Sequence, residues 1–289
     1  MRVAAILGKT GTERDLARFK RSDTTIDILP DLPETTLYDA ALVFGGDGSI
    51  HRQLAALVAT KTPALLVPTG SGNDFARALG LSRISHSLAA WQRFRSGRDN
   101  VRDIDAAQIL QPPTSPGSGL ATHNSYYCCV AGVGLDSEVN RRANSYPAWL
   151  RGNGGYALAV LPSLAAFRAP HVTVEFEDGT RTSEPAMLAA FANAPAYGHR
   201  IRMAPRAQLD DGLLDVCFVR RVNKLKLLTV FPLVYFGAHL RLEEVLYRQV
   251  SRLRISSDPP LDIFGDGEFI CRTPAEIAIM PRALRVIVR

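Results

Sequence analysis

The chain is short of cysteine and of long apolar runs, and each shortage excludes a class of protein. Its 289 residues include four cysteines, with no Cys-x-x-Cys pair and no Cys/His spacing typical of zinc. They are expected to be reduced, mostly buried thiols in a cytosol: Cys128, Cys129, Cys217 and Cys271. No stretch approaches the roughly 18 apolar residues of a membrane-spanning helix. The best, Leu227 to Tyr235, is broken by Pro232, so any membrane contact is expected to be peripheral.

Several common enzyme motifs are also missing. Gly8-Lys9-Thr10 looks like the end of a Walker A loop, but Val3 stands where that loop needs its first glycine. There is no G-x-G-x-x-G in the first βα turn, no G-x-S-x-G and no H-E-x-x-H. Interpretations as a P-loop NTPase, an NAD-type dehydrogenase, an α/β-hydrolase or a zinc protease therefore lose their usual support.

The composition is that of a soluble globular protein, with 46% hydrophobic and 21% charged residues. The formal net charge of +6 fits a mildly basic cytosolic enzyme or an attraction to anionic lipid or nucleotide. No basic and aromatic platform appears, so no nucleic-acid partner is expected. The expected location is the cytoplasm, with peripheral contact at the inner membrane face.

The first third of the chain alternates strand and helix patterns. This alternation predicts parallel βαβ units and a doubly wound parallel sheet, so residues 1–106 are interpreted as an α/β nucleotide-binding domain. The expected strands are Arg2 to Leu7, Thr25 to Leu29, Ala40 to Phe44 and Ala64 to Val67, and the expected helices are Glu13 to Lys20, Ser49 to Ala59 and His86 to Arg95.

The remaining residues, 107–289, predict a β-rich, sandwich-like domain, with the tail from about 281 to 289 packing back on the first domain. After a strand at Val101 to Leu110 and a Pro/Gly/Ser loop at 111–122, short β patterns predominate. Helical stretches interrupt them near Gly155 to Phe167 and Lys224 to Phe236. The expected strands include Tyr126 to Ala131, Val172 to Phe176, Met187 to Ala192, Leu213 to Val219, Leu253 to Ser256, Phe269 to Cys271, Glu276 to Met280 and Leu284 to Val288.

Two glycine turns dominate the first domain. Each follows a predicted strand and precedes a predicted helix: Gly45-Gly46-Asp47-Gly48-Ser49 and Gly70-Ser71-Gly72-Asn73-Asp74. Parallel strands would bring both turns to one end of the sheet, where backbone amides suit phosphates. The alternative is a pair of ordinary βα turns, with Ser49, Asn73 or Asp74 as helix caps. Asp47 would repel a phosphate unless it binds Mg²⁺ or takes a proton.

These turns and later segments resemble one family. Phe44 to Ser49 with Pro68 to Arg77 looks like the catalytic domain of the diacylglycerol kinase family, which includes bacterial lipid kinases and sphingosine kinases and is distantly related to NAD kinases. The rest of the chain carries similar segments in the family's order: Gly132 to Asp136, Ala204 to Val216, Asp266-Gly267-Glu268 and Pro274 to Val288. The resemblance implies an active site in a cleft between an α/β domain and a β-rich domain.

The resemblance also implies roles for individual residues. ATP would be held by the first turn and by its partner: Gly45, Gly46, Asp47, Gly48, Ser49, Gly70, Ser71, Gly72 and Asn73. Asp47 would act near the phosphates and Mg²⁺. Glu268, with Asp266 beside it, would be the general base for the lipid hydroxyl, and Asp47 is its rival. Asp211 would ligate a structural Mg²⁺ with the carbonyls of Gln208 and Leu213, and Asp105 would link that metal to the active site.

Each role has a plainer alternative, and the chain departs from the family in places. Asp210-Asp211-Gly212 is also a good turn, and Asp266-Gly267 is a hairpin signal. Leu7 to Gly11 replaces the family's Asn-Pro-x-x-Gly, and Leu29-Pro30 stands where a threonine is expected. His51-Arg52 replaces Asn-Glu, and His51 is either a surface residue or a substrate contact.

The function expected from these features is ATP- and Mg²⁺-dependent transfer of the γ-phosphoryl group to a lipid hydroxyl. The alternatives are an NAD kinase-like phosphotransferase and a non-catalytic nucleotide-binding regulator. The lipid stays open among diacylglycerol, a sphingoid base, ceramide and a polyprenol, and the oligomeric state stays open, a homodimer included. Basic residues precede two apolar helices and predict either contact with an anionic membrane or solvated helix starts: Arg220, Arg221, Lys224, Lys226, Arg141, Arg142 and Arg151.

Overall fold

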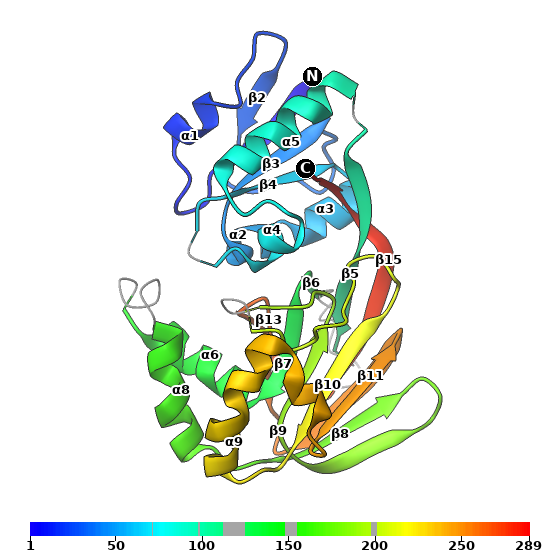
Figure 1. The fold of residues 1–289 in the computed structure, drawn as a ribbon. Coiled ribbons are helices and arrows are strands. Elements are labelled where there is room, and N and C mark those ends of the chain that lie inside the picture. The colour runs from blue at the N-terminus through cyan, green and yellow to red at the C-terminus, as the bar shows by residue number, and fades with distance from the viewer. Residues whose placement is uncertain (71, 98, 112–124, 148–154, 198–200) are drawn as a thin grey trace, which may run out of the picture.

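The computed structural model describes residues 1–70, 72–97, 99–111, 125–147, 155–197 and 201–289. Ser71, Arg151 and most of the predicted loop at 111–122 lie outside these ranges. The chain forms an α/β domain and a β-rich domain, one above the other in Figure 1. None of the described helices is long and apolar enough to cross a membrane. All four cysteines are buried and free, as predicted.

The N-terminal domain contains the predicted parallel sheet. Four parallel strands run in the order β4-β3-β1-β2, and helices connect them. The elements are β1 (Arg2–Ile6), α1 (Glu13–Ala17), β2 (Thr25–Ile28), β3 (Ala40–Gly45), α2 (Asp47–His51), α3 (Leu54–Thr60), β4 (Ala64–Pro68), α4 (Asp74–Ala78) and α5 (Ile84–Gly97).

The residues of this domain explain its layers. Every residue of β3 is buried, which is typical of a parallel strand covered on both faces. Helix α5 buries Trp91 and Phe94, as its pattern predicts, and the two rings stack 5.6 Å apart. The indole of Trp91 donates a hydrogen bond to the carbonyl of Phe19, which fastens α5 to the segment after α1.

The C-terminal domain is β-rich, as predicted, and has a second hydrophobic core between its strands. Strands of this domain pair mainly antiparallel, and helices cover one side. Its elements are β5 (Val101–Leu110), β6 (Ser125–Tyr127), β7 (Val130–Gly134), α6 (Leu135–Ser145), α8 (Gly155–Ala166), β8 (His171–Phe176), β9 (Arg181–Ala192), β10 (Leu214–Arg220), α9 (Lys224–Val230), the 3₁₀ helices η1 (Phe231–Phe236) and η2 (Ala238–Arg241), β11 (Val245–Val250), β12 (Arg252–Asp258), β13 (Asp262–Gly265), β14 (Glu268–Arg272) and β15 (Ala275–Ile287).

Strand β15 joins the two domains into one mixed sheet. It pairs antiparallel with β5 along most of its length, and its end pairs parallel with β4 at Val286 and Ala64. The ammonium of Lys61 donates hydrogen bonds to the carbonyls of Arg282 and Ala283. The two closing strands expected from the sequence are thus one strand, with a bulge between Met280 and Leu284.

Other expected elements are divided or shifted. The helix expected at 49–59 is two helices, because Gln53 interrupts it. The buried side-chain amide of Gln53 donates a hydrogen bond to the Asp31 carboxylate and accepts one from the backbone amide of Leu32. Ser49 does not cap α2, because the helix begins at Asp47 after Gly46. The strand expected at 126–131 is divided into β6 and β7 by Cys128 and Cys129, whose amides turn toward Asp266.

Candidate active site

Turns that follow β1, β3 and β4 lie together at the carboxyl edge of the parallel sheet. The chain adds β2 on one side of β1 and β3 on the other, so the strand order reverses between β1 and β3. Open α/β sheets bind ligands at such a point. The amide of Thr69 donates to the carbonyl of Gly45 across 3.2 Å, and the hydroxyls of Thr10 and Thr69 lie 3.1 Å apart. The structure therefore brings the two predicted glycine turns side by side, with the turn at 7–11 next to them.

The two glycine turns touch so closely that only glycine fits. A Cβ on Gly46 would lie 2.2 Å from the carbonyl oxygen of Gly72, and one on Gly70 would lie 2.6 Å from the amide nitrogen of Gly46. The amide of Asp47 donates to that same Gly72 oxygen across 3.1 Å. Gly46, Gly70 and Gly72 thus form one continuous backbone surface.

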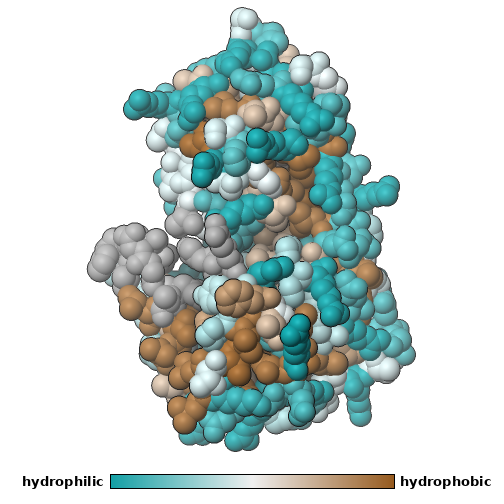
Figure 2. All heavy atoms as spheres, viewed as in Figure 1, coloured by the Kyte–Doolittle hydropathy of each residue, from teal (hydrophilic) through white to brown (hydrophobic). Residues whose placement is uncertain are grey.

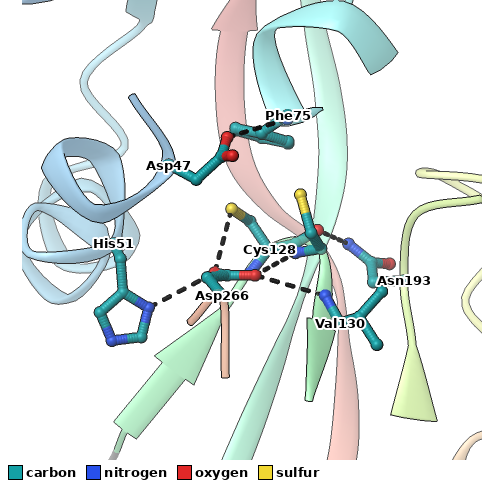
Figure 3. Close-up of polar contacts among 8 residues, drawn as sticks. Asp47, His51, Phe75, Cys128, Val130, Asn193 and Asp266 are labelled. Carbon is teal, nitrogen blue, oxygen red and sulfur yellow. Dashed lines mark hydrogen bonds and ion pairs between the residues drawn. The ribbon is translucent and has the colours of Figure 1, made fainter. Parts of the chain in front are cut away.

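The side chain of Asp47 holds the second glycine turn in place through hydrogen bonds. Its two carboxylate oxygens each accept a hydrogen bond of 3.0 Å, from the amides of Asp74 and Phe75 at the start of α4. Figure 3 shows the hydrogen bond from Phe75. Burial raises the pKa of Asp47; the two amides lower it, the charges of Asp74 and Asp266 raise it, and the result is about 6. Since the amides of Asp47, Asp74 and Phe75 already have partners, a phosphate has fewer donors here than the sequence suggests.

Asp266 is held by an anion-binding nest of backbone amides. Its buried carboxylate accepts hydrogen bonds from the amides of Cys128 and Cys129 at 2.8 Å and of Val130 at 3.3 Å, and from the thiol of Cys128 (Figure 3). Cys128, Cys129 and Asp266 also form a close group of potential metal ligands. However, the carboxylate faces backbone donors, and burial keeps the pKa of the Cys128 thiol well above its ordinary value. The geometry therefore favours a structural role over a metal site. These hydrogen bonds hold the Asp266 carboxylate in place, and together they form its anchor.

His51 connects this anchor to the N-terminal domain. Its Nδ1 lies 3.4 Å from the Asp266 carboxylate, and the two side chains are 16% and 0% exposed. Burial lowers the pKa of His51, but the hydrogen bond to Asp266 and the charges of Asp266 and Glu268 raise it overall. For Asp266, burial raises the pKa, but His51 and the amides of Cys128 and Cys129 outweigh this and lower it. Of the two interpretations of His51 from the sequence, the structure therefore excludes an exposed surface residue.

The anchor sets the position of Glu268. Asp266 and Gly267 have φ angles of 52° and 86° and form the tight turn of the β13–β14 hairpin, as their sequence signal predicts. Glu268 is the exposed first residue of β14. Its carboxylate points at the first glycine turn, since a Cβ on Gly48 would lie 2.9 Å from Oε1. Gly48 and Glu268, which are 220 positions apart in sequence, therefore lie next to each other.

Asp105 lies on a hydrogen-bonded path from Asp211 toward Asp266. The carboxylate of Asp105 accepts the amides of Gly212 and Arg282, both at 2.7 Å. The side chain of Asn193 donates to the carbonyls of Asp105 and Cys128, and the amide of Cys128 donates to Asp266. Burial and the charges of Asp105 and Asp210 raise the pKa of Asp211 despite a hydrogen bond from Leu213. Gln208 and Leu213 flank Asp211 in this loop.

A cavity of about 150 Å³ lies between the domains at this point. Four of its lining residues are aspartates, so the cavity is acidic. Its walls are formed by Asp47, Gly72, Asp74, Cys129, Val130, Asp136, Asn140, Tyr197, Phe264, Asp266 and Gly267.

Sequence reasoning missed Asn193, Asn140 and the amides of Cys128 and Cys129 as parts of this site. For Asn193 a signal existed, because a polar residue directly follows the apolar strand pattern at 187–192. The amides have no side-chain signal. Ser71 lies outside the described residues, and Gly45, Gly48, Ser49 and Asn73 lie in or beside the two turns as expected.

The contact between His51 and Asp266 predicts a pH-dependent stability. We expect His51→Ala to lower the free energy of unfolding by about 1–2 kcal/mol near pH 6. Because the pKa of His51 is raised, its contribution is complete below 6.5 and is lost as pH rises through the folded value. Because the pKa of Asp266 is lowered, its contribution is present above 3.8 and is lost only at lower pH.

Urea unfolding at pH 6 and pH 8 measures this difference. The gap between wild type and His51→Ala should shrink at pH 8, and His51→Asn, which keeps a hydrogen bond without the charge, should fall between them at pH 6. An equal gap at both pH values would contradict the ion pair.

The chain has a two-domain fold with the candidate site between the domains, and solved structures share this fold. The solved structure of a diacylglycerol kinase from Bacillus anthracis has this fold, with a TM-score of 0.70 at 16% identity over 100% of this chain and 96% of that one. An NAD kinase from Archaeoglobus fulgidus in complex with ATP is similar at a TM-score of 0.56 and 14% identity, over 99% and 92% of the two chains.

The chain belongs to the diacylglycerol kinase family. The diacylglycerol kinase catalytic domain matches residues 1–109, and the YegS C-terminal NAD kinase beta sandwich-like domain matches residues 129–288. A diacylglycerol kinase of Mycobacterium tuberculosis is 32% identical over 86% of this chain and 76% of the relative. A diacylglycerol kinase of Bacillus subtilis is 25% identical over 86% and 78%. At the level of the family, these relatives support a lipid kinase.

Proposed function

We propose that this protein transfers the γ-phosphoryl group of ATP to the hydroxyl of a lipid alcohol, with diacylglycerol as the first candidate. The position of Glu268 carries this proposal, since a Cβ added at Gly48 would lie 2.9 Å from its carboxylate oxygen Oε1. It places an exposed carboxylate from one domain against the glycine turn of the other, beside a cavity formed by both. Relatives named diacylglycerol kinase support this class of substrate.

In the proposed reaction the lipid hydroxyl oxygen forms a bond to the γ-phosphorus, and the bond to the β–γ bridging oxygen breaks. Glu268 takes the hydroxyl proton, and ADP leaves with the bridging oxygen. Asp266 holds the hairpin that carries Glu268, and Asp47 holds the second glycine turn against the first. Phosphoryl transfer depends mainly on such positioning and on charge stabilisation.

We also expect a cation to bind with the ATP phosphates in the acidic cavity, because its four aspartates would otherwise repel a triphosphate. Mg²⁺ would supply charge neutralisation for the phosphates when bound. The residues around Asp211 suit a structural Mg²⁺, because carboxylate and carbonyl oxygens are its preferred ligands. Burial and neighbouring charges raise the pKa of Asp211, and a bound cation would relieve that repulsion. Asp211 with the carbonyls of Gln208 and Leu213 would hold this ion.

Magnesium is therefore expected to stabilise the protein through Asp211. At 100 times its dissociation constant, a ligand that binds only the folded state adds about 2.7 kcal/mol of stability. We expect the Tm of the wild type to rise with MgCl₂ and that of Asp211→Asn to stay constant. Asp210→Asn is the matched control, since Asp210 is paired with Arg102 at the surface and should keep the response. Equal Tm shifts in both variants would refute Asp211 as a ligand.

The proposed activity is tested by incubating the purified chain with radiolabelled ATP, MgCl₂ and diacylglycerol in detergent micelles. Formation of labelled phosphatidic acid supports the proposal. Parallel reactions with a sphingoid base, ceramide, a polyprenol and NAD identify another acceptor. ATP binding without transfer to any acceptor would favour a nucleotide-binding regulator and would overturn the proposal.

A further inference from the structure

The described residues expose nine large apolar side chains, and six of them lie on α8, α9 and η1: Leu158, Leu161, Leu225, Leu228, Tyr235 and Phe236. Helix α8 contains no charged residue, and Leu161 on it is 62% exposed. Leu225 on α9 is 73% exposed, and α9 has no buried residue. Figure 2 shows apolar side chains gathered at the lower left, where Figure 1 places these helices. Such a concentration on one face marks an interaction site.

Helices α8 and α9 meet at a basic pocket. The ammonium of Lys224, at the start of α9, donates to the carbonyl of Ala165 near the end of α8 across 2.7 Å. Beside this contact lies a cavity of about 740 Å³ whose lining includes Arg168, Arg221 and Lys224 and no carboxylate. All three cations are exposed. The pocket therefore suits an anionic group.

Most of the basic residues singled out from the sequence are neutralised elsewhere. Arg220 pairs with Glu184, Lys226 pairs with Glu244, and Arg141 pairs with Glu138. Arg142 also pairs with Glu138. In contrast, none of the described carboxylates pairs with Arg168 or Arg221. Arg168, Arg221 and Lys224 thus place three positive charges, with no described carboxylate paired to them, beside the exposed leucines of α8 and α9.

We propose that α8 and α9 form a docking surface for an anionic lipid bilayer. The docking surface consists of Leu158, Leu161, Leu225 and Leu228, which enter the apolar part of the interface, and of Arg168 and Arg221, which bind lipid phosphates. Exposed leucines beside unpaired cations are the combination that binds anionic membranes. A protein partner would need acidic groups against the pocket, whereas a bilayer supplies anionic and apolar material together.

The docking surface lies one helix away from the candidate active site. Helix α6 contributes Asp136 and Asn140 to the acidic cavity and packs against α8. Docking would therefore hold the cavity close to the bilayer. The benefit of holding the cavity near the bilayer rests on the proposed function, but membrane binding itself does not. Experiments can therefore contradict the proposed kinase activity and the proposed docking surface independently. A protein that binds vesicles and phosphorylates nothing would contradict only the activity.

Co-sedimentation of the full chain with vesicles tests the docking surface. Without ATP, we expect binding to phosphatidylcholine vesicles that contain phosphatidylglycerol, little binding to phosphatidylcholine alone, and weakening by salt. Arg168→Gln with Arg221→Gln should lower the apparent affinity about thirtyfold. Leu161→Ser with Leu225→Ser should lower it at least about tenfold. Circular dichroism confirms that each variant is folded.

The matched control is Arg14→Gln with Arg18→Gln, which removes the same charge from exposed positions on and beside α1 in the other domain. This control should bind within about twofold of the wild type. Absence of sedimentation with the anionic vesicles, or equal affinities of the two double arginine variants, overturns the proposal. Light scattering that shows a leucine-dependent dimer without vesicle binding would overturn it in favour of a second copy of the chain.

Discussion

Glu268→Gln is expected to lower kcat for phosphoryl transfer to diacylglycerol by about 10²–10⁴-fold, the usual contribution of a general base. It should change the free energy of unfolding by no more than about 0.5 kcal/mol. The side chain is exposed, and none of the described residues hydrogen-bonds its carboxylate. The amide keeps the size of the side chain and removes its basicity, so steady-state kinetics and urea unfolding separate chemistry from folding.

Asp47→Asn is the matched comparison, because Asp47 is the rival base. One oxygen becomes an NH₂ group that faces an amide of α4, so the second glycine turn should shift. The pKa of Asp47 is raised from 3.8 to about 6 in the folded protein, so the wild type loses stability as pH rises through this range. The uncharged asparagine of the variant does not titrate and has no such loss. The stability of Asp47→Asn relative to wild type should therefore improve over that range. If Glu268→Gln keeps more than about a tenth of wild-type kcat, Asp47 becomes the better candidate.

Local signals in the sequence were sufficient for the parallel sheet, the glycine turns and the hairpin at Asp266-Gly267. Each depends on neighbours in the chain: apolar runs that precede glycines, and a dipeptide that accepts positive φ. The break at Gln53 was not predictable in the same way, because its cause is a contact with Asp31 and Leu32. Helix α6 was missed because it buries only four of its eleven residues.

The connections between the domains were not visible in the sequence. His51 and Asp266 are 215 positions apart, and neither residue type indicates the other. The nest around Asp266 is made of backbone amides, which every sequence contains. Asp47 illustrates the same limit, since its motif suggests a phosphate-side carboxylate, whereas the structure shows both of its oxygens bound to the amides of α4. Its role in holding the turns depends on three-dimensional proximity.

Gly46→Ala should have the largest effect on the fold of the site. The new Cβ would lie 2.2 Å from the carbonyl oxygen of Gly72. That oxygen cannot move away easily, because it accepts the amide of Asp47, whose carboxylate in turn holds α4. Overpacking typically costs 1–3 kcal/mol, and a clash between two constrained backbones should reach about 3 kcal/mol or more. Separation of the turns by about 1 Å should also lower kcat about 10²-fold.

A series of glycine substitutions makes this prediction quantitative and keeps it testable if Gly46→Ala does not fold. A Cβ on Gly72 would lie 3.3 Å from the Asp47 carboxylate, and one on Gly97, at the end of α5, would lie 3.9 Å from Asp99. Gly97→Ala should therefore be neutral or stabilising by up to about 1 kcal/mol, as alanine favours helix. Urea unfolding should rank the losses Gly46 above Gly72 above Gly97. If Gly46→Ala unfolds at the same urea concentration as Gly97→Ala, the turns do not pack against each other as described, and the ATP half of the proposed site loses its structural basis.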